Sequence, residues 1–335
     1  METLLVDFLH TLSPLFLFLI IAVTLFTLSK GADILVDEAV SLSVRWGIPK
    51  MIIGATIVSL GTTLPEATVS VLAAIEGNPD LALGNAVGSV IADTGLIIGL
   101  AALVGTLPVV IEKINKQGRI QLMAGILLVV VSLPIFSKTG TGVIHQWVGF
   151  LFLGLLVVYM VMTIRWARQS NNQEIFEMEE EKSNLFIQIM KLIIGITLVI
   201  LSSKVLIPSV EITAIRIGIP QSVIAATLVA FGTSLPELVT AITAVRKGHG
   251  ELAVGNIIGA DILNVLFVVG SAAAVTSSGL AVPVDFYWLQ FPAMLLILVI
   301  FRIVAKNKRD VITKKEGLLL LGIYVIYIVL NYVVV

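Results

Sequence analysis

Two six-residue blocks place a carboxylate, a proline and two hydroxyls inside strongly apolar sequence. They read Gly-Thr-Thr-Leu-Pro-Glu over residues 61–66 and Gly-Thr-Ser-Leu-Pro-Glu over residues 232–237. A charge at membrane depth is costly and is rarely kept without a functional partner. Glycine and proline break a membrane helix and free its carbonyls. Carbonyl, hydroxyl and carboxylate oxygens suit hard cations such as Na+ and Ca2+. Glu66 and Glu237 therefore indicate a cation site.

Structural roles without any function would explain single residues of these blocks. One proline is usually a packing kink, and one threonine often bonds back to its own helix. The mirrored block of six residues favours a functional site over both.

A second pair of segments adds further polar groups. Ser89 and Asp93 lie one helical turn apart, and the equivalent face of the later segment carries Ala260 and Asn264. Asp93 is the expected ligand. Asp261 either faces the site or braces it, and Asn85 and Asn256 either cap broken helix ends or contact the ion.

Composition defines the class of protein. Of 335 residues, 58% are hydrophobic and 13% are charged, and the mean hydropathy is +1.06. This balance and several long apolar runs predict a polytopic, all-α membrane protein. The chain has no cysteine, which excludes disulfides and thiolate metal sites, and its three histidines are not paired as in a zinc site.

Ten membrane spans are expected, with 31–46 and 207–216 prolonging the first and sixth helices as tilted or bent pieces. The fifth and sixth spans are joined by a polar linker, residues 166–185. The predicted spans are 12–30, 51–75, 80–105, 119–136, 146–165, 186–206, 221–245, 252–275, 286–304 and 315–333.

Lysine and arginine predict the orientation. With both termini outside, 18 of the 21 basic residues face the cytoplasm, and only Lys138, Lys204 and Arg216 lie outside. We therefore expect a multi-pass protein of the cell membrane with a cytoplasmic linker.

The two halves of the chain repeat at a constant offset of 171 residues, which is the separation of Glu66 from Glu237. The repeat covers 45–95 and 216–266. Five spans separate the copies, so the second copy is reversed in the membrane. The expected fold is two inverted five-helix repeats, 1–165 and 186–335, an arrangement typical of secondary transporters.

The two Pro-Glu blocks, each followed by Gly-Asn-x-x-Gly at 84–88 and 255–259, resemble the α-repeats of the sodium/calcium exchanger family. The short linker is similar to that of prokaryotic members. The resemblance implies a central site between the second, third, seventh and eighth spans, with the first and sixth helices sliding as a gate. By position it implies these ligands: Ser59, Thr62, Thr63, Glu66, Ser89, Asp93, Ala230 (through its carbonyl), Thr233, Ser234, Glu237 and Asn264.

The chain also departs from the family pattern. The family commonly has Gly-Ser-Asn where this chain has Gly-Ser-Val at 88–90 and Gly-Ala-Asp at 259–261. Asp93 and Asn264 are exchanged relative to familiar members, and Asp261 adds a fourth carboxylate.

Exchange of Ca2+ for Na+ follows from shared ligands. Glu66 and Glu237 would clamp one Ca2+, or Na+ ions would spread over the same oxygens, and each cation excludes the other. Close carboxylates in a low-dielectric site cannot all stay ionised when empty. We therefore expect protons to compete with Ca2+ from about pH 5 to pH 8 through these two glutamates.

Three alternatives remain at this stage: a H+/Ca2+ antiporter, a cation channel, and an intramembrane aspartyl protease. The protease would need Asp93 and Asp261 as its acid pair, but neither has the Gly-x-Gly-Asp context. The expected partners are inorganic cations and the lipid bilayer, with no nucleic acid and no resident cofactor. One monomer suffices for the site.

Overall fold

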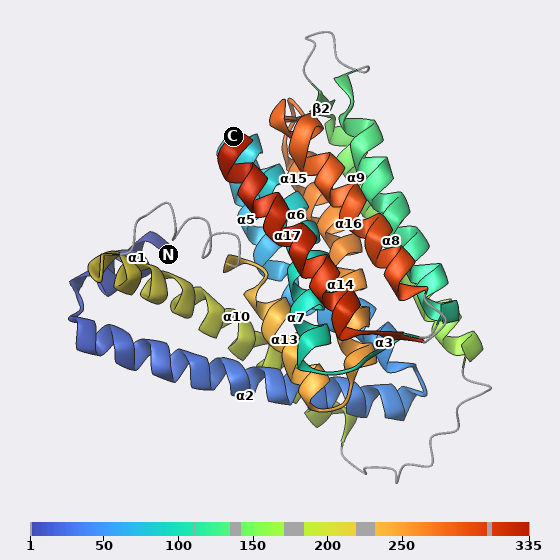
Figure 1. The fold of residues 1–335 in the computed structure, drawn as a ribbon, viewed down its shortest axis with the longest axis horizontal. Coiled ribbons are helices and arrows are strands. Elements are labelled where there is room, and N and C mark those ends of the chain that lie inside the picture. Colours follow the sequence, from blue (N-terminus) through green and yellow to red (C-terminus); the bar gives the residue numbers. More distant parts are fainter. Residues whose placement is uncertain are drawn as a thin grey trace.

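The computed structural model describes residues 2–109, 111–134, 142–170, 184–218, 232–306 and 310–334. These residues are almost entirely helical, as expected from the composition. Their helices form one bundle, and a long pair of helices crosses it obliquely (Figure 1).

The oblique pair consists of α2 (Pro14–Trp46) and α10 (Leu185–Arg216). The two helices pack along their length, and Gly31 and Gly195 lie where their backbones approach most closely. Both predicted extensions, 31–46 and 207–216, are present. Neither forms a separate piece, since each helix is continuous and α10 runs through Pro208. A short helix not expected from the sequence, α1 (Glu2–Thr11), packs against α10.

The second span is broken. It consists of α3 (Lys50–Ile53), the π-helical turn η1 (Gly54–Val58), α4 (Ser59–Thr62) and α5 (Leu64–Ile75). The part before Thr63 is bent by 45° relative to α5. Its counterpart begins in 219–231, which lie outside the described residues, and continues as α13 (Leu235–Arg246).

The third and eighth spans share one design. The third comprises α6 (Pro79–Ala92), η2 (Asp93–Ile97) and α7 (Ile98–Val104). The eighth comprises α14 (Gly250–Leu263), η5 (Asn264–Val269) and α15 (Gly270–Val275). A π-helical turn therefore begins at Asp93 in one span and at Asn264 in the other. Such turns are frequent at functional sites.

The remaining helices enclose this centre. They are α8 (Ile111–Ser132), α9 (Gln146–Ser170), η6 (Phe286–Gln290), α16 (Phe291–Ala305) and α17 (Lys314–Val334). Two small antiparallel sheets join the loops: β1 (Leu107–Pro108) pairs with β4 (Val311–Ile312), and β2 (Val143–Ile144) with β3 (Leu280–Ala281).

Within the described residues, six helices are long and apolar enough to cross a membrane, or seven if the bent second span is counted. Helices α8 and α17 occupy two further predicted spans without meeting that criterion. Residues 221–231 of the predicted span 221–245 lie outside the described residues, and most of the remainder forms α13. Of these candidate spans the eighth is the most enclosed, because 94% of its 18-residue apolar stretch is buried inside the protein.

Small residues allow the broken span to approach the eighth. A side chain at Gly255 would collide with the backbone of Met51, and one at Gly259 would lie 2.6 Å from the Cα atom of Ala55 and from Ser59 Oγ. The equivalent Gly84 and Gly88 face no other described atom within 4 Å.

Candidate cation site

The bend at Thr63 directs Glu66 into the protein interior. Pro65 stands in the first turn of α5, where its missing N–H is tolerated, and Glu66 follows it. The Glu66 side chain is only 1% exposed, and a carboxylate near a helix N-terminus is favoured by the helix dipole. Ser59, Thr62 and Thr63, from the preceding turn, are equally buried.

The second block has the same local geometry. Pro236 lies in the first turn of α13, and Glu237 is 1% exposed. Ser234 is buried and Thr233 is half-buried. Ala230 lies outside the described residues.

Asp93 and Asn264 meet between the third and eighth spans. The Asn264 amide donates to Asp93 Oδ2 over 3.5 Å, a long hydrogen bond between two fully buried groups. Ser89 is buried one turn before Asp93. The two positions that are exchanged relative to the family pattern are therefore direct neighbours.

The buried carboxylates form one electrostatic group. The charge of Glu66 acts on Glu237, and Asp93 interacts with Glu66, with Glu237 and with Asp261. The hydroxyls lie crosswise: Thr233 is close to Glu66, whereas Thr62 and Thr63 are close to Glu237. Each acid therefore faces hydroxyls contributed by the other repeat.

The acids are not neutralised by protein groups. Among the described residues, no hydrogen bond reaches either carboxylate oxygen of Glu66 or Glu237, Asp93 Oδ1, or the hydroxyls of Thr63 and Ser234. Buried polar atoms are normally partnered, so this set of orphaned oxygens calls for an additional positive group. Oxygen atoms with no partner fit a hard cation.

The ligand set is rich in neutral oxygens. Within the described part of the chain, no three carboxylate or imidazole side chains converge closely enough to hold a metal by themselves. A cation here would take two carboxylates at most, with hydroxyls and carbonyls completing its shell. That composition suits Na+ and Ca2+.

Asp261 has a different environment. Its Oδ2 accepts hydrogen bonds of 2.5 Å from Thr94 Oγ1 and from Gln121 Nε2, while its Oδ1 is buried with no described partner. The sequence left its role open between ligand and brace, and two donors on one oxygen favour the brace. Gln121, the only amide within the predicted fourth span, was detectable as a polar residue in an apolar run, but Thr94 carried no such signal.

Asn85 joins the two halves. Its Nδ2 donates to the Glu66 carbonyl over 3.1 Å and to Ser70 Oγ over 2.9 Å, and its Oδ1 accepts from Thr233 Oγ1 over 3.0 Å. It therefore ties α6 to α5 and to the second Pro-Glu block, and the choice between helix capping and ion contact stays a prediction. In contrast, neither polar atom of Asn256 has a described partner.

A cavity of about 310 Å³ reaches this centre from one side. Its walls come from α1, α10 and the two proline turns, and Lys204 and Glu211 are its charged residues. Pro65, Thr233 and Pro236 are among its lining residues. The cavity therefore ends at residues adjacent to Glu66 and Glu237.

Ion pairs join α2 to the turn after α13, at the end of α13 away from Glu237. Lys247 Nζ lies 2.8 Å from both oxygens of Asp37 and 3.3 Å from Asp33 Oδ1. Partial burial would lower the pKa of Lys247, but its hydrogen bond to Asp37 and the charges of both aspartates raise the pKa. Lys247 thus stays protonated at neutral pH and ties α2 to the core.

Comparison with known proteins identifies the family. The family profile described as "Sodium/calcium exchanger protein" matches residues 16–165 and 187–333, which is most of the chain. This chain belongs to the sodium/calcium exchanger family. The two matched segments agree with a repeat, and the family comprises transporters rather than enzymes.

Relatives of the exchanger family align over nearly their whole length. The inner membrane protein YrbG of Escherichia coli K12 is 33% identical over 309 residues, covering 90% of this chain and 92% of YrbG. The sodium/calcium exchanger MaX1 of Methanosarcina acetivorans is 28% identical over 350 residues, covering 94% of this chain and 98% of MaX1.

The fold is that of a solved exchanger. A structure of the sodium-calcium exchanger NCX_Mj, soaked with 100 mM Na+ and 10 mM Sr2+, superposes with a TM-score of 0.78 at 27% identity. The match covers 95% of this chain and 99% of NCX_Mj. The protein is therefore a multi-pass membrane transport protein with the NCX_Mj-like fold.

Proposed function

We propose that this exchanger moves Ca2+ in one direction and Na+ in the other by alternating access. The observation that carries the proposal is the pair of buried glutamates, Glu66 and Glu237, whose oxygens lack partners and whose charges interact. A cation is the group that can neutralise both acids at once.

The proposed architecture is ten spans in two inverted repeats, 1–165 and 186–335, joined by the linker 166–185. Positive-φ glycines support it, because Gly47 and Gly77 in the first copy correspond to Gly218 and Gly248 in the second. The sheets support it as well. Each joins the loop after one copy's third span to the loop after the other copy's fourth span.

The proposed ligands divide into two sets. Glu66 and Glu237 bind Ca2+ directly, with Asp93 beside them, and Asp261 acts as a brace. The neutral oxygens come from Ser59, Thr62, Thr63, Ser89, Thr233, Ser234, Asn264 and, by the repeat, the Ala230 carbonyl.

Mutual exclusion of the two cations produces the coupling. Calcium loses its hydration shell only where several oxygens, including anionic ones, replace it. Sodium ions that occupy the same oxygens cannot be bound together with Ca2+. Each type of ion therefore binds only after the other has dissociated. Protons compete for the same carboxylates, which predicts weaker Ca2+ binding at low pH.

The relatives support this choice of ions. MaX1 is named a sodium/calcium exchanger, and NCX_Mj crystals were soaked with Na+, Ca2+ and Sr2+. We assign both termini to the outside and the linker to the cytoplasm, which places the 310 Å³ cavity on the outer side and Lys247 on the inner side.

H+/Ca2+ antiport remains a second candidate, because Asp93 and Asn264 are interchanged relative to the family pattern. The carboxylate therefore lies on the third span and the amide on the eighth. The two functions are separated by their driving gradient. Only a Na+/Ca2+ exchanger accumulates Ca2+ when a Na+ gradient is imposed at constant pH.

The test is 45Ca2+ uptake into proteoliposomes driven by an outward Na+ gradient or by a pH gradient. We expect uptake with the Na+ gradient, and its loss in Glu66→Gln, Glu237→Gln and Asp93→Asn. Glu76→Gln, at the end of α5, is the matched control and should transport normally. Normal exchange in folded Glu237→Gln contradicts the site, and uptake driven only by pH contradicts the counter-ion.

A further inference from the structure

A second cavity, apolar and away from the cation site, lies between α9 and the broken second span. Its volume is about 610 Å³, within the range of ligand pockets. The end of α2 closes one part of it with Trp46, Gly47 and Ile48. None of the proposed cation ligands lines it.

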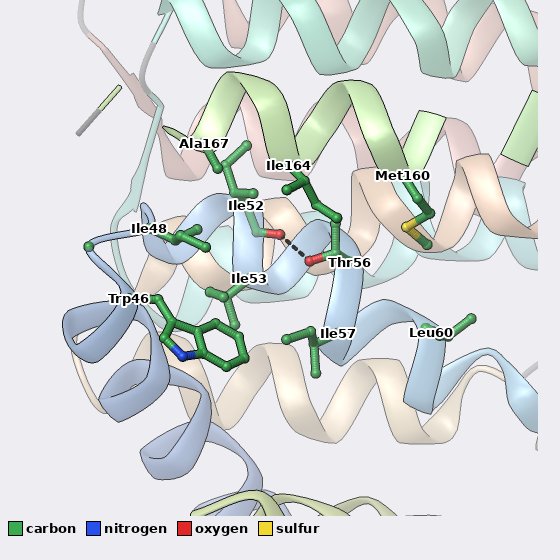
Figure 2. A pocket seen from close by; sticks show the side chains of 11 residues that line it. Trp46, Ile48, Ile52, Ile53, Thr56, Ile57, Leu60, Met160, Ile164 and Ala167 are labelled. Atoms are coloured by element: carbon green, nitrogen blue, oxygen red, sulfur yellow. Dashed lines mark hydrogen bonds between the residues drawn. The ribbon is translucent and has the colours of Figure 1, made fainter. Parts of the chain in front are cut away.

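The described residues of the lining are almost entirely apolar, and apart from Thr56 their only side-chain hydrogen-bond donor is the indole N–H of Trp46. Thr56 supplies the one side-chain hydroxyl, and this group donates over 2.7 Å to the Ile52 carbonyl of its own helix (Figure 2). Water needs two or more polar partners to stay in a buried site. An apolar occupant is therefore favoured over water or a polar ligand.

The cavity has the shape of a slot along the helices. Figure 2 shows Ala167, Ile164 and Met160 following one another along α9, opposite the segment from Ile52 to Leu60. Eight residues of helix span about 12 Å, which approaches half of the roughly 30 Å hydrocarbon core. One acyl chain of a lipid has this length and direction.

Two basic residues are neighbours in the chain of residues that line the slot. Arg45 precedes Trp46, Arg165 follows Ile164, and both arginines are exposed. Arg45, near the end of α2, donates a hydrogen bond to Gln188 of α10 over 3.1 Å. This bond holds the Arg45 side chain against α10. Tryptophan is enriched at the membrane interface, and anionic lipids attract basic residues there by about 1 kcal/mol each.

We propose that this slot binds one phospholipid with an anionic headgroup, its acyl chain between Ile52 and Met160 and its headgroup at Arg45 and Arg165. The lipid touches the end of α2 and the helix that carries Ser59. On the proposed function, those two parts move relative to each other during exchange. The bound chain therefore holds one position of the gate.

Lipid binding to the slot can be measured by tryptophan fluorescence, independently of ion transport. The chain has four tryptophans, so Trp147→Phe, Trp166→Phe and Trp288→Phe leave Trp46 as the only reporter. The protein is placed in phosphatidylcholine nanodiscs with increasing fractions of phosphatidylglycerol brominated on its acyl chains. We expect saturable quenching of Trp46 at low mole fraction, and only gradual quenching by brominated phosphatidylcholine.

Two variants and their controls locate the lipid. Ile164→Phe fills the slot and should abolish the saturable quenching, while Val161→Phe, on the same helix and similarly exposed, should retain it. Arg165→Gln should raise the half-saturating fraction about fivefold, the effect of one basic residue, and Arg119→Gln should not.

Quenching that rises linearly and equally for both headgroups contradicts the proposal, because it describes ordinary surrounding lipid. The same holds if Ile164→Phe and Val161→Phe behave alike. Exchange rates in phosphatidylglycerol and phosphatidylcholine vesicles then test the effect on the gate. A failure of Na+-driven Ca2+ uptake would overturn the proposed function but leave the quenching result intact.

Discussion

At the scale of single residues, Asn85 is the clearest link between binding and folding. It holds the Glu66 carbonyl and Ser70 Oγ and accepts from Thr233. We expect Asn85→Ala to destabilise the protein by about 1–3 kcal/mol, because buried groups lose their partners. Calcium binding should weaken as well, since the turn carrying Glu66 is released.

The measurement is thermal unfolding with and without Ca2+. Ser70→Ala is the matched control, because it removes one of the three contacts and leaves the link to Thr233. Equal losses in Asn85→Ala and Ser70→Ala would show that the connection between the repeats adds nothing.

The residues that carry charge were predictable, and their supporting partners were not. Glu66, Glu237 and Asp93 stood out because ionisable groups are rare in apolar spans. The π-helical turns at Asp93 and Asn264 were not predicted from the sequence, because most of their residue types also occur in the regular helical turns of these spans. Nor does the sequence reveal that Thr94 and Gln121 share one oxygen of Asp261.

At the scale of elements, the ion pairs of Lys247 hold α2 against the turn that follows α13. We expect Lys247→Ala to open this side of the protein. The chain contains no cysteine, so Thr240→Cys, a buried position on α13, becomes a single reporter. A membrane-impermeant maleimide applied from the cytoplasmic side should label it faster when Lys247 is replaced.

Lys116→Ala is the control for this prediction. Lys116 pairs over 2.8 Å with Glu112 on its own helix and lies 5.8 Å from the Trp166 ring of α9, so its loss removes no ion pair between α2 and the turn after α13. Unchanged labelling of Thr240→Cys in the Lys247→Ala protein would mean that the ion pairs do not close this side.

The same turn contains a histidine that responds to pH. Burial and then the charge of Lys50, 3.3 Å away, lower the pKa of His249, against the opposing charges of Glu251 and Asp37; Lys247 also lowers it. Below the ordinary value of 6.5, the unfolded chain therefore binds more protons at this position than the folded chain. Stability should fall as the pH drops below that value and be unaffected above it.

His249→Gln should remove this part of the acid sensitivity. Melting temperatures measured from about pH 7.5 to pH 5.5 should decline less steeply than in the parent. His10→Gln, at an exposed position on α1, should leave the slope unchanged. A parent-like slope in His249→Gln would show that another group governs the loss of stability.

The sequence predicted most elements and the extension of two of them. Hydropathy located the spans because lipid requires long apolar helices. It indicated that 31–46 and 207–216 prolong the first and sixth helices as tilted or bent pieces. Both stretches do continue α2 and α10, and Asp37 and Glu38 on α2 find lysine partners.

At the scale of the whole molecule, the described surroundings of the cation site differ at the two ends of α13. The 310 Å³ cavity reaches Thr233 before α13, whereas Lys247 after α13 pairs with α2. On the proposed function, this asymmetry describes one of the two states of alternating access. We then expect α2 and α10 to move across the core to produce the other state.

Two cysteine reporters test this alternation. Ser203→Cys lines the outer cavity, and Thr240→Cys lies on the inner half of α13. In proteoliposomes, impermeant maleimides should reach Ser203→Cys only from outside and Thr240→Cys only from the cytoplasmic side. Because the two openings exclude each other, ionic conditions that speed labelling at one position should slow it at the other. If Na+ or Ca2+ accelerates both together, the pathway opens through the membrane at once, and the protein conducts as a channel instead of exchanging.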